Sequence, residues 1–568
     1  MLVVLCPQPD GSVSVRDVDR AQAGLPVVAE QTVSLDDLAG LVREREAECT
    51  PEGTSPDASL RWVWADTATT YRALLDAGVR VTRCWDLRLC RAILRASALT
   101  ARTGYATAPR SAWDEAPTAA TAAPDRLFDL APPVTLDPLA ELRDQHRALD
   151  AAVGLDGRPE SARLWLLLAA ESAGALIAAE MTVAGVPWDV VEHDRILTDL
   201  LGPRPALGYR PALLEAKAAQ VSAALGVEVN LDSPVELLRS MRSAGLPATS
   251  TRSWELQQID HPAIAPLLEY KKMSRLMTAN GWHWLDTWVA DGRFRPVYVP
   301  GGVVTGRWAS DGGGALQLPH QIRSAVRSDP GWSLVVADAA QLEPRILAAM
   351  SGDAAMAEAG RAADMYEGMV ATGAVETRQQ AKFGMLGAMY GGTQGESGRM
   401  LPRITRAFPQ ALALVEAAAR AGEQGEVVST WLGRSSPLPS AEWRSAHSAA
   451  SAEGGSAAEQ EAVRTQARSW GRFTRNFVVQ GTAAEWALCW MSLLRLRLRA
   501  LSEGLTDGPH LAFFLHDEIM VHTPTGLADE VATLVQETAH EAGRLLFEGS
   551  PVEFRLTTAV VTAYSDAK

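Results

Sequence analysis

The sequence predicts an α/β protein of several domains. The chain has 568 residues, more than a single hydrophobic core usually organises. Short apolar runs alternate with helical patterns over residues 1 to about 100, and helical patterns dominate over residues 190–291. Two further short apolar runs, residues 334–337 and 513–515, end abruptly on polar segments that contain Asp338 and Asp517. Both runs have the length of buried strands, so the sequence predicts two strands that each end in a carboxylate.

The first carboxylate lies where a strand is expected to pass into a helix. Pro344 fits a helix only in its first turn, which predicts the corner just after Asp338. A carboxylate at the end of a buried strand can hold a hard cation such as Mg²⁺. An aspartate at the start of a helix can equally be a plain cap. Three polar side chains are expected within one turn of Asp338: Gln341, Glu343 and Arg345.

The second carboxylate lies in a predicted hairpin. Residues 513–515 are followed by His516-Asp517-Glu518 and then by the apolar residues 519–521. Carboxylates at the tip of this hairpin could complete a two-metal site with Asp338. Such a site clamps the attacking and leaving oxygens in phosphoryl transfer.

A helix is predicted between these two segments, over residues 378–392. Thr377 can cap its start, and Gly391-Gly392 can end it in a left-handed turn. Cationic side chains one turn apart suit a triphosphate, although surface charges on a helix are the plain alternative. Large or cationic side chains recur every four residues on one face: Arg378, Lys382, Leu386 and Tyr390.

The three segments, in this order, resemble motifs A, B and C of family A DNA polymerases, the group that includes bacterial DNA polymerase I and its Klenow fragment. The resemblance covers residues 180–568. It implies a right-hand polymerase, with an antiparallel palm sheet and helical fingers and thumb. Further matches are Asn230-Leu-Asp-Ser-Pro234, Thr305-Gly306-Arg307 and Gln480-Gly-Thr-Ala-Ala484.

Domain boundaries follow from the resemblance and from the patterns around it. A small α/β domain is expected at the N-terminus, in the position of the family's ribonuclease H-like 3′–5′ exonuclease. Residues 101–159, rich in Ala, Pro and Thr, predict a loop-rich or flexible connection, and residues 435–458 predict a mobile loop. The expected order is a degenerate exonuclease-like domain with linker (1–163), polymerase entry and thumb (164–295), palm with motif A (296–360), fingers (361–469) and palm with motif C (470–568).

The resemblance also implies roles for individual residues. Asp338 and Asp517 would hold two Mg²⁺ ions, for which Mn²⁺ could substitute, with the carbonyl of Ala339 as a further ligand and Glu518 peripheral. Arg378 and Lys382 would bind the β- and γ-phosphates. The expected nucleotide-binding residues are Gln341, Glu343, Tyr366, Arg378, Lys382, Leu386 and Tyr390. The expected DNA-binding residues are Arg307, Gln317, Arg345, Arg472, Asn476, Gln480 and His516.

Some positions depart from the family pattern. Glu343 occupies the position that blocks a ribose 2′-hydroxyl, but the neighbouring ring of the family is replaced by Leu386. Asp364-Met-Tyr366 stands for the usual Asp-Ile-His. Ala315 and Leu318 replace asparagines beside Leu316-Gln317, which puts some template contacts in doubt.

The exonuclease carboxylates of the family are not found. No Asp-x-Glu occurs before residue 170, Asp17-Val-Asp19 is expected in a turn, and Thr70 takes the place of the second aspartate. Residues 164–180 contain no Tyr-x-x-x-Asp. We therefore expect no proofreading.

Composition agrees with an ordinary globular protein, with 47% hydrophobic and 21% charged residues. No run of eighteen apolar residues and no signal-peptide pattern is present, and the five cysteines form no CxxC pair. These observations predict a cytoplasmic protein without a membrane partner, and we expect a monomer. The net charge of −15 argues against nucleic acid, but local arginine-rich helix faces such as Arg464, Arg468, Arg472 and Arg475 can override it.

The expected function is therefore template-directed addition of dNTPs to a primer 3′-hydroxyl, in DNA repair or replication, with primer–template DNA and dNTPs as partners. Two alternatives remain open. A single-subunit RNA polymerase shares the palm, although Glu343 speaks against it. A non-catalytic DNA-binding descendant of a polymerase is the other.

Overall fold

The computed structural model describes residues 1–48, 60–115, 136–154, 160–206, 208–314, 318–392, 395–451, 457–505 and 507–567. The chain divides into two compact units. Unit 1 comprises Met1–Val183, Tyr298–Ser310 and Val335–Ala559, and unit 2 comprises Ala184–Val297, Asp311–Leu334 and Val560–Lys568.

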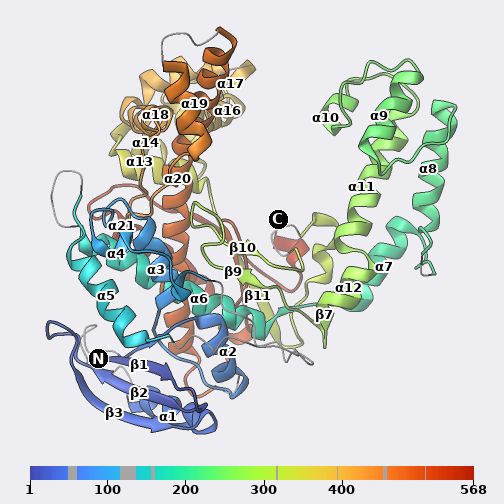
Figure 1. Ribbon diagram of the computed structural model, residues 1–568. Coiled ribbons are helices and arrows are strands. Elements are labelled where there is room, and N and C mark those ends of the chain that lie inside the picture. The colour runs from blue at the N-terminus through green and yellow to red at the C-terminus, as the bar shows by residue number, and fades with distance from the viewer. Residues whose placement is uncertain are drawn as a thin grey trace, which may run out of the picture. The chain divides into compact units, whose positions relative to one another are not determined.

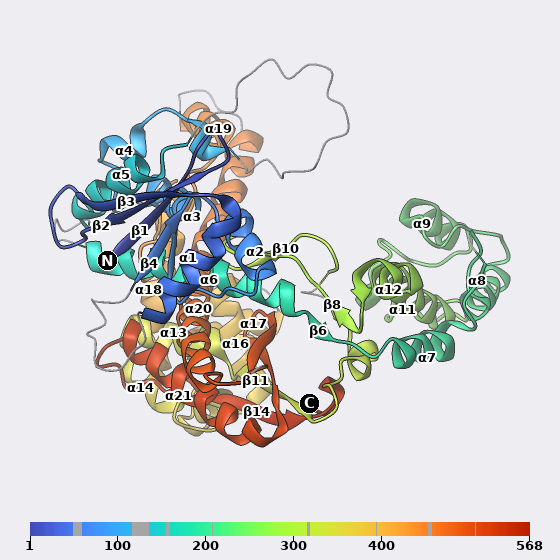
Figure 2. The ribbon, with the colours of Figure 1, turned by 90° about the horizontal axis from the view of Figure 1, so that it is seen from below.

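The N-terminal part of unit 1 is built on a five-stranded sheet in the order β3-β2-β1-β4-β5 (Figures 1 and 2). β1 pairs antiparallel with β2 and parallel with β4. Its core packs side chains of α1, α2 and α6 against the sheet, so the expected small α/β domain is observed. The elements are β1 Leu2–Pro7, β2 Val13–Val18, β3 Val27–Val33, α1 Leu35–Glu48, β4 Arg61–Trp64, α2 Thr67–Asp76, β5 Cys84–Asp86, α3 Leu87–Ala96, α4 Gly104–Thr107, η2 Ala112–Asp114, α5 Pro138–Asp150 and α6 Ser161–Ala184.

The expected turn at Asp17 is wrong. Asp17 lies within β2, opposite Val3 of β1, and its carboxylate pairs with Arg45 of α1. Val13 and Val15 pack into the hydrophobic core, and the pairing of β2 with β1 continues through Asp17 to Val18.

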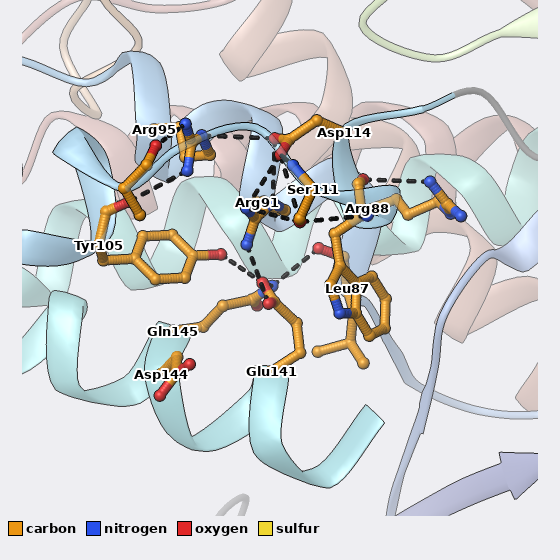
Figure 3. A network of polar contacts seen from close by, with 12 residues as sticks. Leu87, Arg88, Arg91, Arg95, Tyr105, Ser111, Asp114, Glu141, Asp144 and Gln145 are labelled. Atoms are coloured by element: carbon orange, nitrogen blue, oxygen red, sulfur yellow. Dashed lines mark hydrogen bonds and ion pairs between the residues drawn. The ribbon is translucent and has the colours of Figure 1, made fainter. Parts of the chain in front are cut away.

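The Ala-, Pro- and Thr-rich stretch is also more ordered than expected, because α5 packs into the domain. Arg91 of α3 lies 3.0 Å from Asp114 and 3.0 Å from Glu141 of α5. Glu141 also accepts hydrogen bonds from Tyr105 and Gln145, and Figure 3 shows this network. A buried, mutually satisfied set of charges and polar groups fixes a helix that composition alone does not predict. Residues 116–135 and 155–159 lie outside the described residues.

The second part of unit 1 contains a four-stranded sheet in the order β12-β13-β11-β14. β12 and β13 form the antiparallel hairpin that the sequence predicted. The short β9 and β10 pair separately, and the segment between them carries Arg307. The elements are β9 Tyr298–Val299, β10 Ala309–Ser310, β11 Trp332–Ala339, β12 His510–Leu515, β13 Glu518–Pro524, η5 Thr525–Leu527, α21 Ala528–Leu546 and β14 Leu556–Val561.

A group of helices between β11 and β12 gathers around α20, and α18 packs along it (Figure 1). The mobile loop expected over residues 435–458 is wrong in part, because residues 441–451 form α19 and α20 begins at Ala457. Alanine favours helix, whatever the serine content. The elements are α13 Leu342–Ser351, α14 Ala354–Ala359, α15 Met365–Ala371, α16 Arg378–Tyr390, α17 Gly395–Ala407, α18 Pro409–Glu423, α19 Ala441–Ser451 and α20 Ala457–Leu501.

Unit 2 is mainly helical, as expected for residues 190–291. The small sheet β6-β8-β7 and a second hydrophobic core around Leu237, Met241 and Leu267 hold it together. The elements are β6 Val186–Pro187, α7 Val190–Leu201, α8 Ala212–Leu225, α9 Pro234–Ser243, α10 Ser253–Leu256, α11 Ile264–Asn280, α12 Trp282–Trp288, β7 Val289–Ala290, β8 Arg293–Phe294, η4 His320–Ala325 and η6 Tyr564–Ala567.

Two helices bear on the expected organisation. The boundaries proposed at 163/164 and 469/470 fall inside α6 and α20, and the division into thumb, palm and fingers stays a prediction.

By length and composition alone, α6 and α20 could cross a membrane. Most of each apolar window is buried within the protein, as in core helices.

Candidate active site

Two carboxylates predicted as metal ligands come from neighbouring backbone segments. Asp338 is the penultimate residue of β11, and Asp517 is the second residue of the two-residue turn between β12 and β13. The amide nitrogen of Ala339 donates to the carbonyl oxygen of Asp517 at 2.9 Å. This bond joins the end of β11 to the hairpin turn, so the structure brings Asp338 and Asp517 together.

Asp338 is not a helix cap. β11 continues through Ala339, and the helix begins only at Leu342, with Gln341 in the capping position. Pro344 is the third helical residue, as predicted. The expected corner therefore lies about two residues later than the sequence suggested, and the plain-cap alternative is wrong.

The third carboxylate of this region is less accessible. Glu518 is the first residue of β13, opposite Leu515, and is 3% exposed. Within the described ranges, no group of three or more His, Cys, Asp or Glu side chains is placed to hold a metal ion. The pair Asp338 and Asp517, with nearby peptide carbonyls, is an all-oxygen donor set, which fits Mg²⁺ or Mn²⁺.

Backbone strain flanks this pair of aspartates. Gln341 has φ +50° and His516 has φ +60°, and both are residues with a Cβ. At His516 a positive φ at the first loop position permits a tight two-residue hairpin turn. Left-handed conformations of such residues cost free energy and often occur at functional sites. Partial burial and the nearby Arg307 guanidinium lower the pKa of His516, whereas Glu343 acts in the opposite sense.

Glu343 is held from two sides. Nη2 of Arg307 donates to Oε1 of Glu343 at 2.6 Å, and the hydroxyl of Tyr390 donates to Oε2. The three residues come from the segment after β9, from α13 and from the end of α16. Burial and the hydrogen bond to Glu343 raise the pKa of Tyr390, so it remains a donor at neutral pH. The position expected to select the sugar is thus fixed by two partners.

The predicted helix of cationic side chains is observed as α16. Thr377 accepts a hydrogen bond from the amide of Gln380 at 3.2 Å, and Gly391 ends the helix with φ +74°. Lys382 is exposed, and Leu386 is half-buried. The spacing of four places the chosen residues on one face, as expected.

Asp364 is a site residue that sequence reasoning missed. Its Oδ2 accepts from Nε of Arg378 at 2.8 Å, and its Oδ1 caps α15 through the amide of Tyr366 at 2.8 Å. Gln341 also contacts α15, where its Oε1 accepts from the amide of Met365 at 3.2 Å. Burial raises the pKa of Asp364, but hydrogen bonding to Arg378 and to the α15 amides outweighs it and lowers the pKa overall. A capping aspartate before a helix was visible in the sequence, but its partner was not.

Tyr366 lies beside the same ion pair. It is 7% exposed, and the Arg378 guanidinium carbon lies 5.8 Å from its ring centroid. Burial raises the pKa of Tyr366 to about 12, with Glu343 and Asp364 acting in the same sense. A neutral phenol can donate a hydrogen bond but supplies no positive charge.

Arg307 and His516 are described above, and the other residues expected to contact DNA divide into three cases: a stripe on α20, Gln317 and Arg345. Arg472 is exposed and Asn476 and Gln480 are partly buried, whereas residues 474, 475, 477–479 and 481 of α20 are buried. Arg472 starts this stripe beside the end of α16, because a Cβ on Gly391 would lie 2.7 Å from its Cγ. Gln317 lies outside the described residues.

Arg345 does not fit the DNA-binding role expected for it. It is 1% exposed, and its guanidinium donates to the backbone carbonyls of Ala340, Gly360 and Glu553 at 2.6–2.8 Å. Burial lowers its pKa to about 10. Because α13 turns this side chain into the core, Arg345 joins the helix to other backbone segments.

The family can now be assigned. Residues 210–560 match the model of DNA polymerase family A, which is more than half of the chain. The chain belongs to DNA polymerase family A. Among curated relatives it is 26% identical over 417 residues to a thermostable DNA polymerase I of Thermus filiformis, covering 67% of this chain and 46% of the relative. It is 26% identical over 351 residues to DNA polymerase I of Chloroflexus aurantiacus, covering 56% and 34%.

A solved structure supports the fold assignment. The POL domain of Pol1 from M. smegmatis, in a complex with DNA primer-template and dNTP, matches with a TM-score of 0.65 and 19% identity. The match covers 100% of this chain and 95% of the other. This family A chain therefore has a polymerase fold, and it spans about half the length of the curated relatives it matches.

Proposed function

We propose that this family A chain is a DNA-directed DNA polymerase that adds dNTPs to a primer 3′-hydroxyl. The observation that carries the proposal is the 2.9 Å hydrogen bond between Ala339 and Asp517. This bond joins the backbone of Asp517 to the end of β11, next to Asp338, and the cationic helix α16 lies in the same unit. Family membership supports the same conclusion.

The carboxylates of Asp338 and Asp517 would hold the divalent ions, with the carbonyl of Ala339 as a further ligand. When held by these residues, divalent ions would activate the 3′-hydroxyl as a nucleophile and would neutralise charge on the leaving pyrophosphate. Arg378 and Lys382 would bind the β- and γ-phosphates, which requires Arg378 to exchange Asp364 for the nucleotide. Tyr366, as a neutral donor, would bind a phosphate oxygen. Tyr390 would lie near the templating base and would hold Glu343 against the sugar.

Arg307 and the stripe of Arg472, Asn476 and Gln480 would contact primer–template DNA, together with His516. We further propose that the enzyme does not proofread. In the N-terminal domain, two aspartates that flank α2 and β5 serve as helix caps. Asp66 caps α2, and Asp86 caps α3 and accepts from the amide of Thr67 at 2.8 Å. β1, the first strand of the domain, contains no acidic residue.

Primer extension on a labelled primer–template tests the function. We expect extension with dNTPs that requires Mg²⁺ or Mn²⁺ and is much weaker with rNTPs. Preference for rNTPs would instead support an RNA polymerase. Binding of DNA without extension in either ion would support the non-catalytic alternative.

A further inference from the structure

The turn that carries Arg307 rests directly on two charged side chains from other parts of unit 1. A Cβ on Gly301 would lie 2.4 Å from Oε1 of Glu171, and a Cβ on Gly306 would lie 2.5 Å from Nε of Arg434. Both glycines have left-handed backbone, with φ +61° and +85°. Only glycine allows the backbone to approach these charges so closely in this conformation.

Glu171 and Arg434 form one buried ion pair beneath the turn. Nη2 of Arg434 lies 2.7 Å from Oε2 of Glu171, and the two side chains are 12% and 1% exposed. Glu171 comes from α6, and Arg434 comes from the loop that follows α18. A pair this buried has a defined geometry, because each charge needs the other to offset its desolvation.

A second buried carboxylate fixes the loop that presents Arg434. Oε2 of Glu485 on α20 accepts from the amide of Leu432 at 3.0 Å, and its Oε1 accepts from the hydroxyl of Thr430. The amide of Trp431 donates to Oγ1 of Thr482 at 3.0 Å. Three consecutive loop residues are therefore attached to α20, and Glu485 itself is 1% exposed.

The arrangement is not optimal for stability alone. Nε of Arg434 and Oγ1 of Thr305 are buried and have no hydrogen-bond partner among the described residues. A buried donor without a partner lowers the stability of the folded state, because its desolvation is not offset. An unsatisfied buried group in a native structure calls for an explanation, and a functional requirement on the position of the turn is one.

The other end of this chain of contacts is the candidate active site. Arg307 follows Gly306 directly and bonds Glu343 at 2.6 Å. Gly481, next to Gln480 on α20, lies against the same turn, since its Cβ would be 3.1 Å from the carbonyl oxygen of Thr305. The supports of the turn thus determine where the Arg307 guanidinium lies.

We propose that Arg434 is a positioning residue: held by Glu171 and by the loop that Glu485 anchors, it supports the turn at Gly301 and Gly306 and so sets where Arg307 meets the primer–template. The inference rests on the proposed function. Arg434 is mostly buried, so it acts through Arg307 and not by its own contact with DNA.

A double-mutant cycle separates these two modes of action. Affinity for primer–template is measured by fluorescence anisotropy for the wild type, Arg307→Ala, Arg434→Met and the double variant. We expect each single variant to weaken DNA binding by on the order of tenfold, and the double variant to be no weaker than Arg307→Ala alone. Arg434→Lys, which keeps a charge opposite Glu171, should restore part of the affinity. Full additivity in the double variant, or wild-type affinity in Arg434→Met, overturns the proposal.

Three further variants separate displacement of the turn from general destabilisation. Arg495→Met removes another buried arginine of unit 1, paired with Glu180 at 2.7 Å, without touching the turn. Its DNA affinity should stay within about twofold of the wild type. Gly301→Ala changes no charge but displaces the turn. It should therefore weaken DNA binding as Arg434→Met does, and it provides the test if Arg434→Met folds poorly. Gly504→Ala shares the left-handed φ and meets nothing within 4 Å, and it should bind DNA normally. Normal DNA binding by Gly301→Ala overturns the proposal.

The readout also distinguishes failure of this inference from failure of the proposed function. If the DNA-binding cycle is non-additive but the wild-type protein extends no primer, Arg434 is supported as a positioning residue and the polymerase function is refuted. Additivity in an active enzyme refutes the positioning role and leaves the polymerase intact. A wild type that neither binds nor extends primer–template refutes both.

Discussion

Oδ2 of Asp364 lies 2.8 Å from Nε of Arg378, so the side chain expected to bind the triphosphate already has a carboxylate partner. The Arg378 and Asp364 side chains are 49% and 24% exposed, and solvent screens their attraction. Such pairs typically contribute less than about 1 kcal/mol. A triphosphate, with more charge and more acceptor oxygens, can displace this partner.

Asp364→Asn should therefore lower the KM for dNTP, by up to about fivefold, because it removes the competing charge. Asparagine caps a helix as well as aspartate does, so α15 should remain intact. Steady-state kinetics at fixed primer–template measures the effect. Glu376→Gln, which removes the partner of Arg403 instead, is the matched control. A raised KM in Asp364→Asn would show that the carboxylate assists nucleotide binding.

Asp517→Asn should reduce extension by at least two orders of magnitude while primer–template affinity stays within a few fold. The amide cannot replace a carboxylate charge at the divalent ion, yet its backbone bond to Ala339 is retained. Single-turnover extension and anisotropy give the two quantities. Asp529→Asn, at the exposed start of α21, should change neither. Near-normal turnover of the Asp517 variant would refute the two-metal assignment.

Leu386→Phe should sharpen selection against rNTPs, and Glu343→Ala should weaken it. An aliphatic side chain cannot form the flat wall beside the sugar that a ring forms, while Glu343 is fixed by Arg307 and Tyr390. The ratio of dNTP to rNTP incorporation efficiency measures both effects. Leu386→Met keeps the aliphatic character and should leave the ratio unchanged. If Leu386→Phe and Glu343→Ala both leave the dNTP to rNTP ratio unchanged as well, these residues do not select the sugar and the assignment is wrong.

A 3′-mismatched, end-labelled primer should not be shortened when it is incubated with the protein and Mg²⁺ in the absence of dNTPs. Thr70 stands where the resemblance places the second carboxylate, and the first strand β1 contains no acidic residue, whereas a two-metal nuclease needs several carboxylates. A proofreading family A polymerase serves as the positive control. Shortening that persists in Asp338→Asn and Asp517→Asn variants, but is lost when residues 1–160 are deleted, would contradict this prediction.

Unit 2 should become less stable as the pH falls from about 6.5 to about 4. His193 is buried, its Nδ1 accepts from Trp188 at 3.2 Å, and its Nε2 donates to the carbonyl of Asn280 at 2.9 Å. Burial lowers its pKa to about 4. The unfolded chain, with an ordinary pKa near 6.5, therefore binds the proton first, and stability rises with pH in this window. The full difference corresponds to about 3 kcal/mol.

Hydrogen exchange of the α7 and α11 amides across this pH range measures the effect locally. His193→Gln removes the titrating group and should flatten the pH dependence. His540→Gln, at an exposed position, should leave it unchanged. Equal pH dependence in the wild type and His193→Gln would show that another group is responsible.

Several site features were predictable because they depend on local sequence. The strand before Asp338, the hairpin around Asp517 and the capped helix from Arg378 to Gly391 follow from short apolar runs, turn residues and caps. The errors have equally local causes. Composition predicted loops over α5 and α19. Buried polar contacts stabilise α5, and the helix propensity of alanine favours α19.

The sequence by itself determined which residues carry charge at the ends of β11, β12 and α16, and in which order, because strand length and helix spacing are set by neighbours in the chain. Only the tertiary structure decided which of these charges meet. Arg345 turns into the core, Arg378 pairs with Asp364, and Arg307 bonds Glu343 from a turn that lies against Arg434. These pairings join residues up to 263 positions apart, as in Glu171 and Arg434. They depend on how whole elements pack, which no local pattern records.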